Sequence, residues 1–527
     1  MGVIGTTKVV PCYKALFIEF FRSPPGISER QNGWRQRPYA ASSFTFRAEY
    51  LVTMRAAQAR WAGGAVRDRV GILRRLRGRL AADARAVAET VPTSLPGALH
   101  RSVADTLVSE VLPLIEACRF LERQAERILQ TRRLGMRGRP VWLTGMQSEV
   151  ERAPWGVVLV IAPANYPLLL AGVQTLQALV GGNAVLWKPA PGTEKPARVL
   201  REMLVESGLD GELLTILESD AGNATAAIAA GVDHVVLTGS AETGRAVLRQ
   251  LAETLTPATM ELSGCDAVFV LPGADLERTA GAIVFGMRFN GSFTCMAPRR
   301  VFLVGFAEGH AANFEARLAE ALRELGSVAI SAATAQLLHG MVREARGHGA
   351  EVVLDGLRKG VETASATLIT GATPDLLCMQ ASVFAPVLSV MRTANLEEAL
   401  AADASCQYGL TASVFGPEAE ARKVAGRLRV GHVLINDVVI PTADPRVSFG
   451  GRGRSGFGVT RGMDGLLAMT TPKTVQVSRG DRKRAWAATG EGHVEFFAGL
   501  AAVLHGDGLR ARVEGLKRVV RAARTLN

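Results

Sequence analysis

The sequence predicts an α/β protein with two parallel-sheet domains that follow one another along the chain. Short aliphatic runs alternate with helical patterns over about residues 153–261, and a second alternation fills about residues 267–455. This alternation predicts parallel sheets, because a parallel strand needs a long crossover connection that is usually a helix. The runs are continuously apolar, as strands are when both faces of a sheet are covered.

Composition places the chain among ordinary globular proteins. Its 527 residues are 48% hydrophobic and 21% charged, which is enough for large buried cores. The net charge is +12, but residues 1–60 hold nine Lys and Arg against three acidic residues, and residues 481–527 hold nine against five. Because the excess lies at the ends without a nucleic-acid-binding motif, we expect no nucleic acid partner. Two interpretations of the basic ends stay open: they are simply solvated, or they bind an anionic partner.

Cysteine usage and hydropathy indicate a cytoplasmic protein. The six cysteines form no Cys-x-x-Cys pair, so neither a zinc site nor a disulfide framework is predicted, and we expect no metal. Lys14 and Glu19 interrupt the apolar stretch near the start, which argues against a secretory signal. No run of 18 apolar residues predicts a spanning helix. The cysteines are Cys12, Cys118, Cys265, Cys295, Cys378 and Cys406.

The first domain is predicted from helical patterns and three strands. Residues 1–45 lack periodicity and are interpreted as a disordered extension. Apolar spacing of three and four residues predicts helices over 46–92 and 100–131. Ligands of a parallel sheet bind at the carboxyl ends of its strands, so the residues after each run are candidates for a binding site. The runs are 157–161, 184–187 and 234–237.

Six further runs predict the strands of the second domain. The segments 139–152 and 472–480 are predicted to be edge strands outside both domains. Residues 481–527 form a basic tail, in which 509–524 have the pattern of a basic amphipathic helix. The six runs are AVFVL, RVFLV, EVVLD, VLSVM, ASVFG and HVLIN.

Three residues are candidates for catalysis. A cysteine is usually a small buried hydrophobe, but Cys295 in FNGSFTCMAPRR lies in a glycine-containing turn. A thiolate that attacks an aldehyde forms a thiohemiacetal, whose oxyanion needs a backbone N–H and a side-chain amide as donors. Asn165 in APANYP can supply the amide, and Glu261 in TMELSG is a candidate base. Taken singly, Asn165 is an ordinary turn residue and Glu261 a solvated charge at a helix end.

Considered together, these motifs resemble the aldehyde dehydrogenase superfamily. PWGVVLVIAPANYP, LWKPA, LTGSAETG, MELSG and FTCMAPRR follow one another in the order of that family. VFAPV, GLTASVF, GHVLIND and SFGGRGRSGFG continue the order, and the separation of 34 residues between Glu261 and Cys295 is similar to that family. The resemblance covers about residues 46–478, nearly the whole predicted folded body.

The resemblance implies a reaction and a domain organisation. Cys295 would attack the aldehyde, Asn165 and the Cys295 N–H would hold the oxyanion, and Glu261 would activate the water that hydrolyses the thioester to a carboxylic acid. NAD or NADP would be the cofactor, and the protein would be a homodimer or homotetramer. The implied domains are a Rossmann-like cofactor-binding domain (46–138 and 153–261), a second α/β catalytic domain (262–471), a small β oligomerisation element (139–152 and 472–480) and the helical tail (481–527).

Cofactor-binding residues are assigned by the same resemblance. Lys188 follows a strand, where its ammonium can reach ribose hydroxyls, and Gly239 and Ser240 open a helix whose N-terminus suits a pyrophosphate. Gly244 would let that helix pack closely on the sheet. The implied set also includes Ala162, Pro163 and Phe384.

Two positions depart from the family pattern. Pro191 stands where a glutamate usually contacts the adenosine ribose, and Ser382 stands where a second glutamate holds the nicotinamide ribose. A carboxylate at the first position favours a free 2′-hydroxyl over a 2′-phosphate, so Pro191 leaves room for NADP. The departures also leave open a catalytically weakened or silent relative that serves as a binding or assembly protein.

Side chains near the predicted nucleophile indicate an apolar substrate pocket. Tyr166, Phe289, Phe293 and Met296 are candidates to line a tunnel for the aldehyde. A long apolar aldehyde is one hypothesis for the substrate. Local packing of the same side chains is the alternative.

The tail offers a second kind of contact. The predicted helix over 509–524 has apolar residues on one face and basic residues across or beside it. Such a helix can lie weakly in the headgroup plane of an anionic membrane and hold the protein at its periphery. The alternative is that the stripe packs on the enzyme or on a neighbouring subunit. The apolar residues are Leu509, Val513, Leu516, Val519 and Val520, and the basic ones are Arg510, Lys517, Arg521 and Arg524.

Overall fold

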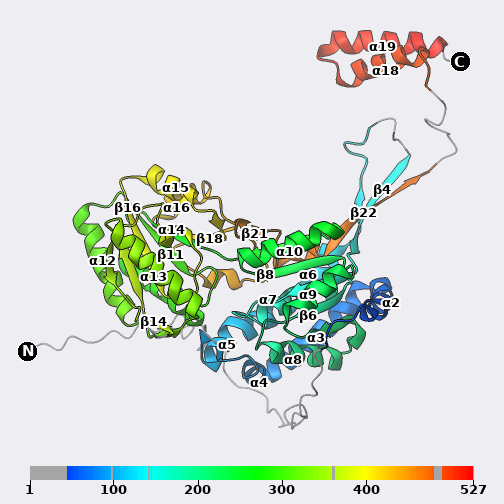
Figure 1. Ribbon diagram of the computed structural model, residues 1–527. Helices are drawn as coiled ribbons and strands as arrows, with labels where there is room; N and C mark the ends of the chain where they lie inside the picture. Colours follow the sequence, from blue (N-terminus) through cyan, green and yellow to red (C-terminus); the bar gives the residue numbers. More distant parts are fainter. Residues whose placement is uncertain are drawn as a thin grey trace, which may run out of the picture.

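The computed structural model describes residues 44–95, 99–140, 143, 145–358, 362–479 and 489–525. Figure 1 shows two α/β bodies, each with a central sheet between helices. The predicted class, α/β with two sheets rich in parallel strands and a small antiparallel sheet, is confirmed. The prediction of disorder for residues 1–45 falls almost entirely outside the described residues. Phe44 is described, and it forms a parallel bridge to Leu217.

The first sheet has six strands in the order β21-β9-β8-β5-β6-β7. Five of them are parallel and doubly wound, because the chain runs outward from β5 to β7 and then returns to the other side of β5 for β8 and β9. The short strand β21 (Gly456–Phe457) joins the β9 edge in antiparallel orientation. The parallel strands are β5 (Val157–Ile161), β6 (Ala184–Lys188), β7 (Leu214–Ile216), β8 (His234–Gly239) and β9 (Ala258–Leu262).

Helices of the first body cover both faces of this sheet. The helices α3 and α6 pack on each other and on α7, which is buried along its whole length. The helical pattern predicted over 46–92 is confirmed as three helices, and Gly64 after α2, which is extended at ψ 159°, makes the first break between them. The helices are α2 (Glu49–Gly63), α3 (Val66–Ala82), α4 (Ala84–Ala88), α5 (Val103–Thr106), the π-helical turn η2 (Leu107–Val111), α6 (Leu112–Leu129), α7 (Leu169–Val180), α8 (Glu194–Glu206), α9 (Ala221–Ala229) and α10 (Ala241–Thr254).

The second sheet has seven strands in the order β13-β15-β16-β11-β10-β18-β19. All neighbours are parallel except β13 and β15. All six predicted runs are strands, and the sequence pattern missed β15, which has only four residues. The strands are β10 (Asp266–Val270), β11 (Pro298–Val304), β13 (Glu351–Leu354), β15 (Thr367–Thr370), β16 (Val387–Thr393), β18 (Thr411–Phe415) and β19 (His432–Ile435). Helices between them include α11 (Leu276–Arg288), α12 (Glu308–Arg323), α13 (Ala332–Gly347), α15 (Leu396–Ser405) and α16 (Glu418–Ala425).

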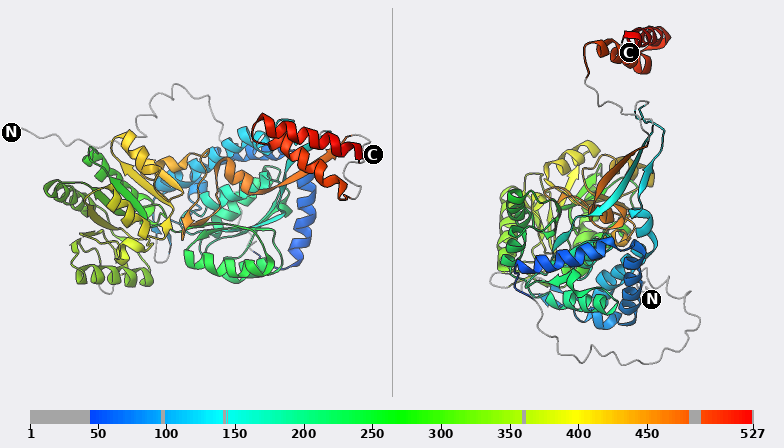
Figure 2. Two further views of the ribbon diagram at one scale, coloured as in Figure 1. Left: turned by 90° about the horizontal axis from the view of Figure 1, so that it is seen from above. Right: turned by 90° about the vertical axis from the view of Figure 1, so that its right-hand side faces the viewer.

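A three-stranded antiparallel sheet extends away from both bodies, as Figure 1 and the right view of Figure 2 show. Its order is β22-β4-β3, and β4 pairs with β22 over their full lengths of nine residues. The strands are β3 (Arg132–Leu134), β4 (Met146–Pro154) and β22 (Thr470–Ser478). The strand predicted over 139–152 therefore begins later and ends later than expected.

Two helices of the tail pack on each other as an antiparallel hairpin. They are α18 (Gly492–His505) and α19 (Gly508–Thr525), so the helix predicted over 509–524 is confirmed. A Cβ on Gly499 would lie 2.8 Å from the backbone nitrogen of Val519, and one on Gly515 would lie 2.7 Å from the Ala502 Cβ. Glycine at these two positions permits the close crossing. Throughout the described ranges, no helix combines the length and apolar content needed to cross a bilayer.

Candidate active site

The predicted cofactor-binding residues of the first body, together with Glu261, lie at the carboxyl ends of the strands of the first sheet. Parallel strands present their carboxyl ends at the same edge, which is where ligands of doubly wound sheets bind. The strands β6, β5, β8 and β9 are neighbours in that order, so residues at their ends form one line. Lys188 ends β6, Ala162 and Pro163 follow β5, Gly239 ends β8, and Glu261 lies near the end of β9.

The start of α10 fits the phosphate groups of a dinucleotide. Ser240 caps the helix, and its Oγ accepts a hydrogen bond of 3.1 Å from the backbone N–H of Thr243. A Cβ on Gly244 would lie 2.8 Å from Leu262 Cδ1, so only glycine lets α10 pack this closely on the end of β9. Helix N-termini bind anionic groups through free N–H donors and the helix dipole. These features and the Lys188 ammonium are what ribose and pyrophosphate require.

Cys295 lies in the turn between α11 and β11, and left-handed residues precede it. Asn290, Gly291 and Ser292 have φ values of 53°, 61° and 64°. This backbone is costly for Ser, so tertiary contacts must hold the turn. Arg299 donates a hydrogen bond of 3.2 Å to the carbonyl of Ser292. Of the five cysteines that the structure describes, four are buried and Cys295 is partly buried.

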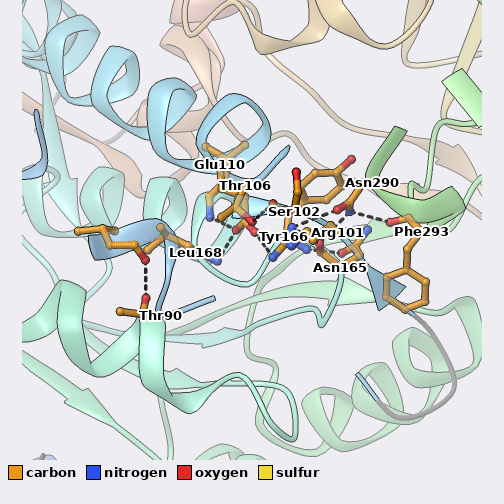
Figure 3. A network of polar contacts seen from close by, with 12 residues as sticks. Thr90, Arg101, Ser102, Thr106, Glu110, Asn165, Tyr166, Leu168, Asn290 and Phe293 are labelled. Atoms are coloured by element: carbon orange, nitrogen blue, oxygen red, sulfur yellow. Dashed lines mark hydrogen bonds and ion pairs between the residues drawn. The ribbon is translucent and has the colours of Figure 1, made fainter. Parts of the chain in front are cut away.

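A buried ion pair ties this turn to the first body (Figure 3). The side chains of Arg101 and Glu110 are fully buried and approach to 2.5 Å. Arg101 also donates to Asn290 Oδ1 at 3.1 Å, and Asn290 Nδ2 donates to the carbonyl of Asn165 at 3.0 Å. Glu110 accepts two backbone N–H groups at the start of α7. The network therefore holds the loop of Asn165 and the turn of Cys295 in one arrangement.

The amide of Asn165 is oriented by the neighbouring residue. Its Oδ1 accepts the backbone N–H of Tyr166 at 3.0 Å, so Nδ2 is the end left to donate to a ligand. The Tyr166 hydroxyl lies 2.7 Å from Oγ1 of Thr294, the residue before Cys295.

One cavity brings together Cys295 and Glu261, the predicted nucleophile and base. Its wall includes five of the predicted residues: Cys295, Glu261, Tyr166, Phe289 and Met296. The rest of the wall is largely apolar and includes Val108, Leu169, Leu170, Val439, Ile440 and Phe449. Glu261 lies on β9 and is 2% exposed, so the interpretation of a solvated charge at a helix end is wrong.

Two other predicted residues lie away from the cavity wall. Phe293 packs on Phe384, with ring centroids 4.4 Å apart. Phe293 therefore fits the packing alternative better than the tunnel. Asn165 does not line the cavity, and it is joined to the nucleophile turn through Asn290.

Burial sets the protonation of the two reactive groups. It raises the pKa of the Cys295 thiol, and the charges of Glu261 and Asp266 raise it further. Burial also raises the pKa of Glu261, while Arg461 and a 3.0 Å hydrogen bond from Thr460 lower it. A carboxyl group whose pKa lies above its usual range is a suitable general base near neutral pH. In the part of the chain that the structure describes, no group of His, Cys, Asp and Glu could hold a metal ion.

Sequence reasoning missed four residues of the site: Arg101, Glu110, Thr460 and Arg461. Glu110 sits in the apolar helical stretch LVSEVLPLIE, and a charge there is a visible signal of a buried pair. Its partner Arg101 carries no comparable signal. Arg461 and Thr460 precede a glycine in a polar segment and look like loop residues.

A cysteine and a carboxylate that face one cavity, beside strand ends of the kind that bind dinucleotides, are the arrangement expected of an enzyme that uses a nucleotide cofactor. The particular family follows from comparison. Residues 48–475 match the model of the aldehyde dehydrogenase family, and the chain belongs to this family. The predicted family and enzyme class, an NAD(P)-dependent aldehyde dehydrogenase, are thereby confirmed.

Three relatives illustrate the similarity. The chain is 28% identical over 471 residues to 4,4'-diapolycopene aldehyde oxidase of Methylomonas sp., with 87% of each chain covered. It is 29% identical over 443 residues to a putative succinate-semialdehyde dehydrogenase [NADP(+)] of Mycolicibacterium smegmatis, with 81% and 83% covered. The fold is similar to that of betaine aldehyde dehydrogenase from Staphylococcus aureus in complex with NAD+, at a TM-score of 0.75, 22% identity and coverage of 84% and 89%.

Proposed function

We propose that the protein oxidises an apolar aldehyde to a carboxylic acid, with Cys295 as nucleophile and Glu261 as base. The observation that carries the proposal is that both side chains line one largely apolar cavity. Cys295 attacks the carbonyl carbon, and the thiol proton leaves to a base. The Asn165 amide and the Cys295 N–H donate to the oxyanion of the thiohemiacetal.

The second half of the reaction depends on Glu261. The bound nicotinamide supplies the acceptor for the hydride, and the remaining group on Cys295 is a thioester. Glu261 takes a proton from water, whose oxygen attacks the thioester carbon. The carbon–sulfur bond breaks, the carboxylic acid is released, and Cys295 remains as the thiolate. Lys188, Gly239 and Ser240 are proposed to bind the cofactor, with Gly244 as a packing residue.

The substrate proposal rests on the cavity wall. Apolar side chains suit a long apolar aldehyde, and a relative is named for oxidation of diapolycopene aldehyde. A second group of relatives is named for succinate semialdehyde, a short anionic substrate. A panel of aliphatic aldehydes of increasing length together with succinate semialdehyde, assayed with NAD and NADP, discriminates the two. No reduction of either cofactor with any aldehyde would instead favour a silent binding or assembly protein.

Cofactor selectivity should be relaxed. Pro191 provides no carboxylate against a 2′-phosphate, so we expect kcat/KM with NADP within about tenfold of that with NAD, or about 1.4 kcal/mol. Initial rates at saturating aldehyde measure both values. The matched variant Pro191→Glu should restore a preference for NAD. A wild-type preference beyond about a hundredfold for NAD contradicts this expectation, because that would be about 2.8 kcal/mol of discrimination from other residues.

We also propose that the small antiparallel sheet serves assembly into a homodimer or homotetramer. The strand β22 is an edge strand of nine residues, and most of it is exposed. A long exposed edge is a template for pairing with another chain. The proposed domains keep the predicted bounds: residues 46–138 and 153–261 bind the cofactor, 262–471 form the catalytic domain, and the segments 139–152 and 472–480, which include most of β4 and β22, serve oligomerisation.

The tail hairpin is proposed to touch an anionic membrane surface from the cytoplasm. α19 exposes an apolar stripe that includes Leu509 at 81%, and six of its side chains are basic against one acidic. Phe497 of α18 is also half exposed. Vesicles with anionic lipid should pellet the full chain at low salt and release it at high salt, because each basic residue contributes about 1 kcal/mol.

Two further chains control for this prediction. A chain without residues 481–527 should stay in solution, and the double variant Lys517→Gln, Arg521→Gln should bind less while keeping α19 helical. Equal pelleting of full and shortened chains would leave the tail as a structural element that packs within the assembly.

A further inference from the structure

Arg461 brings a positive charge into the catalytic cavity. Its side chain lines the cavity together with Cys295 and Glu261, and the residue is 8% exposed. The residue before it is Thr460, whose hydroxyl donates to Glu261 Oε2. A buried guanidinium is costly unless an opposite charge or hydrogen bonds compensate it. The rest of the cavity wall is largely apolar, so a specific interaction must compensate the burial of this charge.

Three contacts hold Arg461 in place. One guanidinium nitrogen, Nη1, donates to the carbonyl of Thr442 at 2.7 Å, and the guanidinium lies over the Phe449 ring at 4.4 Å. The backbone N–H donates to Gln177 Oε1 at 3.2 Å. The backbone itself has φ 61° and ψ 170°, a region that non-glycine residues rarely adopt. Strain of this kind persists where the surrounding structure enforces it, and it clusters at functional sites.

Glu261 and Arg461 also present complementary groups that have no partner. Within the described part of the chain, Glu261 Oε1 and Arg461 Nε are buried and make no hydrogen bond. One is a carboxylate acceptor and the other a cationic donor, and both side chains line the cavity beside Cys295. The charge of Arg461 lowers the pKa of Glu261, and both unpartnered atoms remain available to a water or a substrate inside this cavity.

We propose that Arg461 is a positioning residue for the general base, and that its guanidinium holds Glu261 in the ionised form inside the cavity. The inference rests on the proposed function, because it requires Glu261 to activate water. A carboxyl group as deeply buried as Glu261 would otherwise be neutral and could not accept a proton. Arg461 provides the opposing charge without occupying Oε1.

Other titratable groups near Arg461 do not replace this role. Its charge acts on Glu261, Cys295, Tyr166 and His432. Burial and Arg461 both lower the pKa of His432, so His432 adds no second cation. Burial raises the pKa of Tyr166, which keeps it neutral. The thiol of Cys295 is the one other group whose ionisation Arg461 would assist in the reaction.

The direction of the pH effect follows from the sign of the charge. A general base works above its pKa, so acyl-enzyme hydrolysis should rise with pH along an acid limb set by Glu261. Removing a nearby cation raises the pKa of a carboxyl group. Loss of Arg461 should therefore move the acid limb to higher pH, whereas a lysine at this position should keep most of the charge effect.

The test uses the full-length enzyme and three variants: Arg461→Met, Arg461→Lys and Arg152→Met. Arg152 is the matched control, because its guanidinium is partly buried and donates to the carbonyls of Leu467 and Thr470 away from the cavity. Aldehyde and cofactor are mixed rapidly with each protein. The reduced-cofactor burst reports acylation, and the following hydrolysis rate is measured from about pH 5 to pH 9. Thermal unfolding checks that each variant is folded.

We expect Arg461→Met to shift the acid limb of hydrolysis upward by at least about one pH unit, which is tenfold in the ionised fraction. Arg461→Lys should stay within about half a unit of wild type, and Arg152→Met should not shift. The inference is overturned if folded Arg461→Met shows no shift in the acid limb of its pH–rate profile. It is also overturned if both Arg461 variants lose the same fraction of the hydrolysis rate at every pH. Failure of the proposed function is recognised separately, since Glu261→Gln would then hydrolyse its acyl-enzyme at the wild-type rate.

Discussion

Replacing Cys295 by alanine should lower aldehyde oxidation by about 10⁴-fold or more, because no other group can form the covalent intermediate. Folding should be little affected. One sulfur atom is lost at a partly exposed turn, so the free energy of unfolding should change by no more than about 1 kcal/mol. Steady-state reduction of the cofactor and thermal unfolding measure the two effects.

The matched control for this substitution is Cys378→Ala. Cys378 is buried in α14 (Leu377–Gln380) within the core of the second body, and it does not line the described cavity. Its loss should leave kcat near wild type. If Cys295→Ala instead retains a substantial fraction of kcat, the nucleophile has been assigned to the wrong residue.

Replacing Glu261 by glutamine should stop turnover after the thioester forms. Hydride transfer precedes hydrolysis, so one equivalent of reduced cofactor should appear as a burst. The steady-state rate should then fall by about 10²–10⁴-fold, the usual contribution of a general base. Glutamine keeps the shape of Glu261 and can still accept the hydrogen bond from Thr460. The change therefore removes the charge rather than the packing.

A stopped-flow trace with excess aldehyde and cofactor decides between the outcomes. Double substitution of Glu261→Gln with Cys295→Ala should remove the burst, which assigns it to the thiol. A steady-state rate for Glu261→Gln equal to that of wild type would remove Glu261 from the role of base. Loss of the burst itself would mean that Glu261 is needed earlier, for ionisation of Cys295.

Much of the fold was predictable because its signals are local. Buried parallel strands are continuous apolar runs, and nine such runs in the two bodies were recognised before their pairing was known. Three strands escaped because polar residues interrupt their apolar runs: β7 (LTI), β9 (ATMEL) and β15 (TLIT). The break after α2 depends on an extended Gly64, which a helical pattern does not reveal.

By itself the sequence determined the class and the family and singled out Cys295 and Glu261 as the residues proposed to react, since residue types in a fixed order along the chain carry that information. Only the tertiary structure decided how these residues are supported. Arg101 meets Asn290 across 189 positions of sequence, Glu110 meets the backbone of Leu168 across 58, and Arg461 comes to Glu261 across 200. A buried charge is stabilised by whatever partner the fold brings beside it, and that partner leaves no pattern in the residues around the charge.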